Sequence, residues 1–405
     1  MDLSPLSGIR VVDLTQYEAG TSCTQSLAWL GAEVIKIESP RYGEQGRISS
    51  RDIPGIDSPY FLLLNANKQS VALDLKSEQG KKIIRKLIET ADVFVENFGP
   101  GSIERLGLSY DDVAAINPRI IYGTIKGYDP EGPYGTYLSM DPIGQAMGGS
   151  IAITGLPDGT PVRPGPTMAD TGSGLHLTIG ILAALRERDT SGEGQKVSVS
   201  MQEAMINFCR ISYSRTISAG DRPVERAGSG MGLKAAPARL YVCKPGGPND
   251  YIYVYASRTP QSRHWDRILE TIGREDLKGD PRFATAESRW EHREIVDGII
   301  SEWTGQRTKI EAVHALAGAG VPAGAVMNPA ELAEDPHLNS NGAFVKVSRP
   351  DRGEYKMPGW PVKMSRWKPT IVAAPTLGAN TREVLSTLVD VTDAELDQLE
   401  SDGVI

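Results

Sequence analysis

Short apolar runs alternate with amphipathic stretches along the first 200 residues of the chain. Six of these runs are rich in Val and Ile and have the length of buried strands. Because helical stretches separate them, the pattern predicts an α/β fold with a mostly parallel sheet and helices on both of its faces. The predicted strands are Ile9–Leu14, Glu33–Ile37, Val71–Leu75, Val93–Val95, Ile120–Ile125 and Lys196–Val199.

The helix predicted after Ser77 shows the helical pattern most clearly. Its apolar residues Ile83, Ile84, Leu87 and Ile88 fall on one face, and Ser77 is a favourable N-cap residue. Three further helices are predicted in the same part of the chain, at Ser22–Leu30, Gly174–Arg188 and Met201–Phe208.

The pattern changes after about residue 219. A loop with alternate glycines precedes two predicted strands, Leu240–Val242 and Tyr251–Tyr255, and helices are predicted between residues 263 and 318. The proline-rich stretch Pro358–Pro375 predicts an extended segment, and a last helix is predicted near Asp393–Leu399. We therefore expect a large domain at 1–224, a smaller α+β domain at 225–328, and a C-terminal strap at 329–405 that returns to the large domain.

Composition limits the classes of partner. The chain has 405 residues, 40% of them apolar, and a formal net charge of −8 without a basic tract, so we expect no nucleic-acid partner. Its five histidines and three cysteines lack metal-ligand spacing, and we expect no metal site. The start of the chain does not read as a signal peptide, and no window approaches the ~20 apolar residues that span a bilayer. We expect a soluble, cytoplasmic protein with no membrane partner.

Two common kinds of site lack their motifs. The strand Ile9–Leu14, the turn at Gly20 and the acid Glu38 follow the order of a dinucleotide-binding unit. The segment Glu18–Ser22 has a single glycine, however, and lacks the glycine motif that lets the backbone approach a pyrophosphate closely. Dinucleotide binding is therefore disfavoured. No Gly-x-Ser-x-Gly motif surrounds a serine, which leaves a hydrolase triad without support.

Asp170 is the acid with the most suggestive surroundings. It follows the Gly/Pro-rich stretch Gly148–Pro166 and precedes a predicted apolar helix. Position alone favours an N-cap role. A nucleophilic role is compatible with it, because a helix N-terminus keeps a carboxylate ionised. We expect the small residues Gly172 and Gly174 to leave room for a substrate beside it.

Short motifs follow one another along nearly the whole chain. They are Gly8–Leu14, Ser22–Gln25, Leu27–Trp29, Gly31–Glu38, Arg51–Pro54, Leu64–Asn65, Asn67–Lys68, Val95–Phe98, Pro100–Gly101, Ile116–Arg119, Gly192–Val197, Gly320–Pro322, Asp335–Pro336, Leu377–Gly378 and Gly403–Ile405. In this order the chain resembles the family III CoA-transferases, and most closely their formyl-CoA:oxalate CoA-transferase branch. The match is specific for the family and less so for the substrate.

The resemblance implies a Rossmann-like large domain, a small domain, and two subunits interlocked like the links of a chain. It places the nucleophilic aspartate at Asp170 and makes coenzyme A, or an acyl-CoA, a substrate. We expect Lys76 and Arg105 to bind its phosphates. The residues expected to contact CoA or the reacting centre are Glu18, Ala19, Leu73, Asp74, Leu75, Lys76, Asn97, Phe98, Gly99, Arg105, Leu138, Met140 and Asp141.

The family's chemistry would proceed through an aspartyl mixed anhydride and an aspartyl–CoA thioester, which requires water to be excluded. The loop with Gly228, Gly230 and Gly232 is either a lid over the site or an interdomain linker, and as a lid its backbone N–H groups could stabilise oxyanions. Ile48 is expected near the entrance of the site.

Three positions depart from the oxalate-using branch. Glu18 replaces a glutamine, Leu138 replaces a lysine, and the glycine loop is a looser version of the branch's four-glycine lid. Leucine in place of a cation favours a bulkier, less polar acid, and Ile48 points the same way. We therefore predict succinyl-CoA as donor and a substituted succinate, such as a benzylsuccinate, as acceptor. Because some members that use such acids pair two related subunits, we expect either a homodimer or a heteromer with a related subunit.

Three alternatives stay open. One is formyl-CoA:oxalate CoA transfer itself. Another is an α-methylacyl-CoA racemase, whose proton-transfer histidine would precede Asp141, where this chain has Met140, a residue that cannot transfer a proton. The third is a non-catalytic CoA-binding partner subunit, which the presence of Asp170 disfavours.

Overall fold

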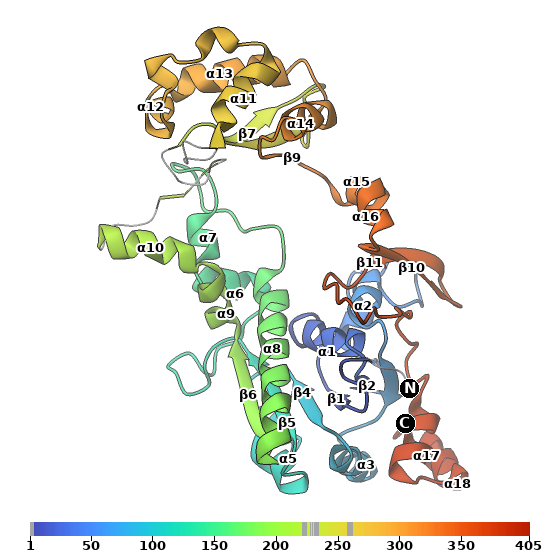
Figure 1. Cartoon of the computed structure of the whole chain (residues 1–405). Coiled ribbons are helices and arrows are strands. Elements are labelled where there is room, and N and C mark those ends of the chain that lie inside the picture. The colour runs from blue at the N-terminus through green and yellow to red at the C-terminus, as the bar shows by residue number, and fades with distance from the viewer. Residues whose placement is uncertain (1–3, 221–224, 227, 229, 231–234, 257–261) are drawn as a thin grey trace. The chain divides into compact units, whose positions relative to one another are not determined.

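A computed structural model describes residues 4–220, 225, 226, 228, 230, 235–256 and 262–405 (Figure 1). The chain forms two compact units. The first comprises Met1–Ser150, Arg163–Ser214 and Asn339–Ile405, and the second comprises Ile151–Val162 and Arg215–Leu338. The domain boundaries at 224/225 and 328/329 stay a prediction.

A six-stranded parallel sheet forms the centre of the first unit, which confirms the predicted α/β class. Its strand order is β3-β2-β1-β4-β5-β6, so the direction of winding reverses between β1 and β4. This is the order of a Rossmann fold. The strands are β1 Arg10–Asp13, β2 Glu33–Glu38, β3 Gln69–Ala72, β4 Val93–Glu96, β5 Ile121–Lys126 and β6 Gln195–Ser200.

One face of the sheet is covered by α3 (Glu78–Glu89), α5 (Tyr110–Ile116), α17 (Thr381–Val389) and α18 (Asp393–Ser401), which share a core with β1, β2, β4 and β5. The apolar face predicted for α3 is buried there. The Ser77 hydroxyl accepts a 2.9 Å hydrogen bond from the Gly80 N–H and caps α3, as predicted.

Two helices of the first unit, α1 (Ala19–Trp29) and α8 (Met168–Ser191), pack closely together (Figure 1). Every residue of α1 is buried. A Cβ at Gly174 would lie 2.5 Å from the Ala19 carbonyl oxygen, so glycine permits the close approach of the two helices. α8 begins six residues before the predicted Gly174 start, which places Asp170 inside the helix.

Residues 339–405 belong to the first unit. They form a hairpin, β10 (Phe344–Arg349) and β11 (Gly353–Pro358), then an extended segment and the helices α17 and α18. The buried Arg47 guanidinium joins this tail to the sheet, because it pairs with Glu38 at 2.6 Å and donates to the Pro375 carbonyl at 3.2 Å.

The second unit contains an antiparallel sheet with the order β7-β8-β9. Its apolar core includes Ile252, Val254, Ile268 and Ile300, so strands and helices share one core and the predicted small α+β architecture is confirmed. Its main elements are β7 Ala238–Val242, β8 Tyr251–Tyr255, β9 Ala323–Ala325, α11 His264–Ile272, α12 Ala286–Glu291, α13 Arg293–Thr304 and α14 Lys309–Gly318.

The remaining elements are short. They are α2 Pro59–Leu64, α4 Ser102–Arg105, α6 Asp141–Met147, α7 Ser150–Ile153, α9 Met201–Phe208, α10 Arg210–Ala219, α15 Pro329–Glu334, α16 Pro336–Ser340, and the 3₁₀ turns η1 Gln45–Arg47, η3 Glu275–Leu277 and η4 Pro281–Phe283. Over the described ranges, no helix combines the length and apolar character needed to cross a bilayer.

Candidate active site

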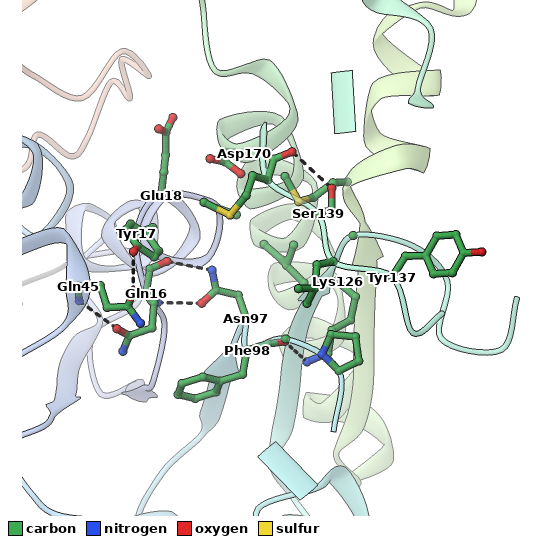
Figure 2. Close-up of a pocket in the computed structure, with 18 residues that line it drawn as sticks. Gln16, Tyr17, Glu18, Gln45, Asn97, Phe98, Lys126, Tyr137, Ser139 and Asp170 are labelled. Carbon is green, nitrogen blue, oxygen red and sulfur yellow. Dashed lines mark hydrogen bonds between the residues drawn. The ribbon is translucent and has the colours of Figure 1, made fainter. Parts of the chain in front are cut away.

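A cavity of about 320 Å³ lies at the carboxyl ends of β1, β4 and β5. This is the edge of the sheet where the winding reverses between β1 and β4, the usual ligand-binding position in such folds. All of its lining residues belong to the first unit (Figure 2). They are Gln16–Ala19, Gln45, Asn97–Pro100, Ile125–Gly127, Tyr137–Met140, Asp170 and Met201.

Asp170 occupies the first turn of α8 rather than its N-cap. The N-cap is Thr167, whose side chain makes no capping hydrogen bond. The Asp141 carboxylate takes that role instead, accepting from the backbone N–H of Ala169 at 3.0 Å and of Asp170 at 3.4 Å. The N-cap reading of Asp170 is therefore wrong, and its side chain is free to face the cavity.

The electrostatic surroundings of Asp170 also differ from expectation. Burial, followed by the nearby carboxylates of Glu18 and Asp141, raises the pKa of Asp170 to about 7. A helix N-terminus was expected to keep this carboxylate ionised. The expectation fails because the Asp141 carboxylate already accepts hydrogen bonds from the first free N–H groups of α8. It also places a second negative charge near Asp170.

Glu18 lies beside Asp170 at one end of the cavity (Figure 2). It is the N-cap residue of α1, and only 7% of its surface is exposed to solvent. One carboxylate oxygen, Oε1, accepts hydrogen bonds from the hydroxyls of both Thr167 and Thr171, the latter at 2.7 Å. Glu18 thus joins the start of α1 to the first turn of α8.

The glycines after Asp170 serve helix packing rather than substrate access. A Cβ at Gly172 would lie 2.3 Å from the Phe208 ring, and one at Gly174 would meet the backbone of α1. Both glycines are buried. The expected space for a substrate lies instead in the cavity in front of Asp170.

Hydrogen bonds made by two side chains, Asn97 and Lys126, fix the opposite wall of the cavity (Figure 2). The Asn97 side chain accepts from the Gln16 N–H at 2.8 Å and donates to the Gln16 carbonyl at 2.9 Å. Lys126 donates to the Phe98 carbonyl at 2.8 Å and to Glu96 at 2.9 Å. These bonds hold the loops after β1, β4 and β5 in one arrangement.

The structure brings eight of the expected site residues together around the cavity, namely Glu18, Ala19, Asn97, Phe98, Gly99, Leu138, Met140 and Asp170. The expected CoA contacts Leu73–Lys76 and Arg105 do not line it; Leu73 is buried in the core, whereas Lys76 and Arg105 are exposed. Asp141 lies behind Asp170, and Ile48 lines a separate, arginine-rich cavity. Gly228 and Gly230 belong to the second unit, and Gly232 falls outside the described residues.

Sequence reasoning missed several residues of the site. Gln16, Tyr17 and Lys126 line the cavity immediately beyond or at the ends of β1 and β5, a position that could have indicated them. Tyr17 adopts φ +58°, a left-handed conformation uncommon for a side chain of its size. Tyr60 also adjoins the site, because burial and the charges of Glu18 and Asp170 raise the pKa of its phenol.

This arrangement suits nucleophilic chemistry by a carboxylate. Asp170 faces a cavity and accepts no side-chain or backbone hydrogen bond on its carboxylate from the residues that the structure describes. Met140 lines the same cavity and offers no titratable group for proton transfer. Across the described part of the chain, His, Cys, Asp and Glu form no group of three or more that could hold a metal ion.

Comparison with known proteins gives consistent matches. A formyl-CoA:oxalate CoA-transferase from Streptomyces coelicolor is 41% identical over 417 residues and covers 100% of both chains. One from Rhodopseudomonas palustris is 37% identical and covers 99% of this chain and 97% of its own. The crystal structure of a CaiB/BaiF family protein from Brucella suis is similar with a TM-score of 0.84 at 29% identity, over 95% of this chain and 99% of that one. A hypothetical protein from Mycobacterium tuberculosis gives a TM-score of 0.78 at 29% identity, over 94% and 98%.

The sequence profile of CoA-transferase family III matches residues 6–381, a span that contains the whole sheet, the cavity and Asp170. With the full-length relatives, this match establishes what the motifs suggested. The chain belongs to CoA-transferase family III.

Proposed function

We propose that this enzyme transfers CoA from formyl-CoA to oxalate through covalent intermediates on Asp170. The observation that carries the proposal is the Asp170 carboxylate, which faces a cavity at the carboxyl edge of the sheet without a hydrogen-bond donor among the described residues. The choice of acids is supported by the full-length relatives from Streptomyces and Rhodopseudomonas, which are formyl-CoA:oxalate CoA-transferases.

The first half-reaction would proceed in two steps. The Asp170 carboxylate oxygen attacks the thioester carbonyl of the donor, a C–O bond forms, the C–S bond breaks, and CoA leaves as thiolate. The thiolate then attacks the aspartyl carbonyl of the mixed anhydride, which forms a C–S bond and releases the donor acid as formate. Asp170 is left as an aspartyl–CoA thioester.

The second half-reaction runs the same chemistry in reverse. An oxalate oxygen attacks the aspartyl–CoA carbonyl and expels the thiolate, giving an aspartyl–oxalyl anhydride. The thiolate attacks the oxalyl carbonyl, producing oxalyl-CoA and regenerating the Asp170 carboxylate. No redox cofactor is needed, and water must be kept away because an anhydride hydrolyses readily.

The CoA contacts stay proposals. Asn97, Phe98 and Gly99 line the cavity beside Leu138, and we propose that they begin a path that leads away from Asp170. We propose that CoA extends along this path to the phosphate partners Lys76 and Arg105, with Leu73–Leu75 alongside, and that the loop of Gly228, Gly230 and Gly232 acts as a lid. We propose further that two subunits interlock, as the resemblance implied.

Succinyl-CoA as donor and a benzylsuccinate as acceptor gain no support from the relatives, and oxalate transfer is the better supported reading. A bulkier acid stays a second candidate on one observation. Leu138 lines the cavity with 78% of its surface exposed, where a lysine was expected for oxalate. Replacing this apolar side chain by a cation should favour oxalate, a small acid of high charge density, over a bulkier substituted succinate.

An acceptor panel tests the substrate assignment. Formyl-CoA and succinyl-CoA are each incubated with oxalate, succinate and benzylsuccinate, and the new acyl-CoA is identified by mass spectrometry. We expect oxalyl-CoA from formyl-CoA as the fastest product, and Leu138→Lys to lower the KM for oxalate. Product only from succinyl-CoA and benzylsuccinate would establish the second candidate instead.

Covalent trapping tests the nucleophile. With an acyl-CoA donor and hydroxylamine, the enzyme should acquire a hydroxamate at Asp170, and Asp170→Ala should acquire none and lose transfer. Full transfer by a folded Asp170→Ala protein would overturn the assignment. A racemase would exchange an α-hydrogen of a 2-methylacyl-CoA without labelling, and a non-catalytic partner subunit would do neither.

A further inference from the structure

The two threonines that flank Asp170 direct their hydroxyls away from it. Thr167 is the N-cap residue of α8 and Thr171 directly follows Asp170, yet both hydroxyls donate to Glu18 Oε1. A Thr N-cap usually bonds the free N–H groups of its own helix. Here that need is met by Asp141, so the Thr167 hydroxyl is available to Glu18.

This arrangement leaves the nucleophile without donors. A hydroxyl has one proton to donate, and each of these two donates it to Glu18. Within the described residues, the Asp170 carboxylate accepts no hydrogen bond, although the Thr171 hydroxyl belongs to the adjacent residue. A carboxylate that accepts strong hydrogen bonds is stabilised as the anion, and its lone pairs are less available for attack.

Glu18 is held firmly enough to enforce this. It begins α1, a helix whose residues are all buried and which packs against α8 through Gly174. The carboxylate therefore has little freedom to release the two hydroxyls.

We propose that Glu18 is a positioning residue that sequesters the Thr167 and Thr171 hydroxyls, so that Asp170 enters the reaction with its carboxylate free of hydrogen bonds. The inference rests on the proposed nucleophilic role of Asp170 and deepens it. A plain charge effect of Glu18 on Asp170 is the competing explanation.

The ionisation state of Asp170 must be the same in all variants to separate these explanations, because charged groups around it shift its pKa. The charges of Glu18 and Asp141 act on Asp170, the charge of Asp170 acts in turn on Tyr60 of α2, and Lys126 is a cation lining the cavity. Plateau kcat values at pH 9 compare the variants with Asp170 fully ionised, so that a change in its titration does not enter.

Four variants test the proposal in acyl-CoA transfer assays. In Glu18→Gln the amide oxygen can still accept both hydroxyls, and plateau kcat should stay within about threefold of wild type. Glu18→Ala frees the hydroxyls, and plateau kcat should fall by roughly tenfold or more. Adding Thr171→Val to Glu18→Ala removes the freed donor and should recover about threefold or more. Thr171→Val alone should change plateau kcat by less than about threefold.

Three results would overturn the inference. They are equal plateau kcat values for Glu18→Ala and Glu18→Gln, no recovery in the double variant, or a loss in Thr171→Val as large as that in Glu18→Ala. Thermal unfolding checks that each variant is folded. If Glu18→Ala does not fold, Glu18→Leu, which fills more of the space and offers no acceptor, takes its place with the same expected loss and the same recovery on adding Thr171→Val. The hydroxamate test on wild type is independent of these variants. If wild type forms no hydroxamate at Asp170, the nucleophile assignment fails, whatever the Glu18 variants show.

Discussion

The Asp141 carboxylate accepts a 3.0 Å hydrogen bond from the Ala169 backbone N–H, at the N-terminus of the helix that contains Asp170. The free backbone N–H groups at this helix end therefore donate to a buried side chain and not to a substrate. The same carboxylate is a like charge beside the Asp170 carboxylate. Together with burial and Glu18, it raises the pKa of Asp170 to about 7.

The rate of transfer should therefore depend on pH near neutrality. Only ionised Asp170 can attack, so kcat/KM should rise about tenfold per pH unit below pH 7 and level off above it. Initial rates between pH 5 and 9 measure this limb. Asp141→Asn keeps the acceptor oxygen, removes the charge, and should move the limb to lower pH. A flat profile down to pH 5 in wild type would contradict the raised pKa.

Asp170→Asn should be inactive and, at alkaline pH, more stable than wild type. A raised pKa makes the protonated folded form favourable, so this stabilisation is present below about pH 4 and is lost as pH rises through about 7. A pKa difference of about 3 corresponds to a loss of roughly 4 kcal/mol in the free energy of unfolding of wild type at alkaline pH. The amide that Asp170→Asn introduces does not ionise, so the variant does not lose this stability. Melting temperatures should differ by several degrees at pH 8.5 and converge near pH 4.5. A difference that does not depend on pH would argue against this origin.

Asp13→Ala should destabilise the first unit severely. Asp13 lies 3.1 Å from the Lys68 ammonium group, with Lys36 nearby, and none of the three side chains is exposed. Burial alone would raise the pKa of Asp13, but the two ammonium groups and Thr15 lower it to about 2. Removing the carboxylate leaves two unpaired buried cations, at a cost of about 3–5 kcal/mol. Urea unfolding measures the loss, and Glu78→Ala, which breaks an exposed pair, should show no comparable change.

Arg47→Met should loosen the C-terminal tail. The guanidinium pairs with Glu38 and Asp57, lies 3.7 Å from the Phe61 ring centre, and donates to the Pro375 carbonyl. Without it, two acidic side chains lose their shared cation, and we expect about 3–5 kcal/mol of destabilisation. Limited proteolysis should cut the segment near Pro375 earlier than in wild type. Arg382→Ala, at an exposed network, is the matched control.

Local patterning was enough to predict the sheet. Each of the six parallel strands overlaps a predicted apolar run, and Ser77 caps the helix that it was expected to cap. The start of α8 was not predictable in the same way. Met168 and Ala169 carry no helical pattern, and the helix extends through them because Asp141, distant in sequence, satisfies its first N–H groups.

The residues of the site also fall into those that the sequence could predict and those that it could not. Asp170 and the loops after β1 and β4 could be located from motifs and strand ends. The pairing of Glu18 with Thr167 and Thr171 could not, because it depends on two helices meeting across about 150 residues of chain. The glycines beside Asp170 show the same limit: sequence shows only that they are small, and the structure shows that Phe208 and α1 fill the space.

The packing of the last helices sets an order for folding during synthesis. Thr381 bonds the backbone of Ala72 at 2.9 Å, the Val404 carbonyl accepts from Asp74 at 2.7 Å, and Leu385 is fully buried in the core under the sheet. A nascent chain that has emerged only as far as β6 therefore holds the six-stranded sheet with α3 and α5 on this face, but without the cover of α17 and α18. The core of the first unit cannot be completed until α17 and α18 have left the ribosome, and until then the apolar residues that they cover are a natural target for chaperones.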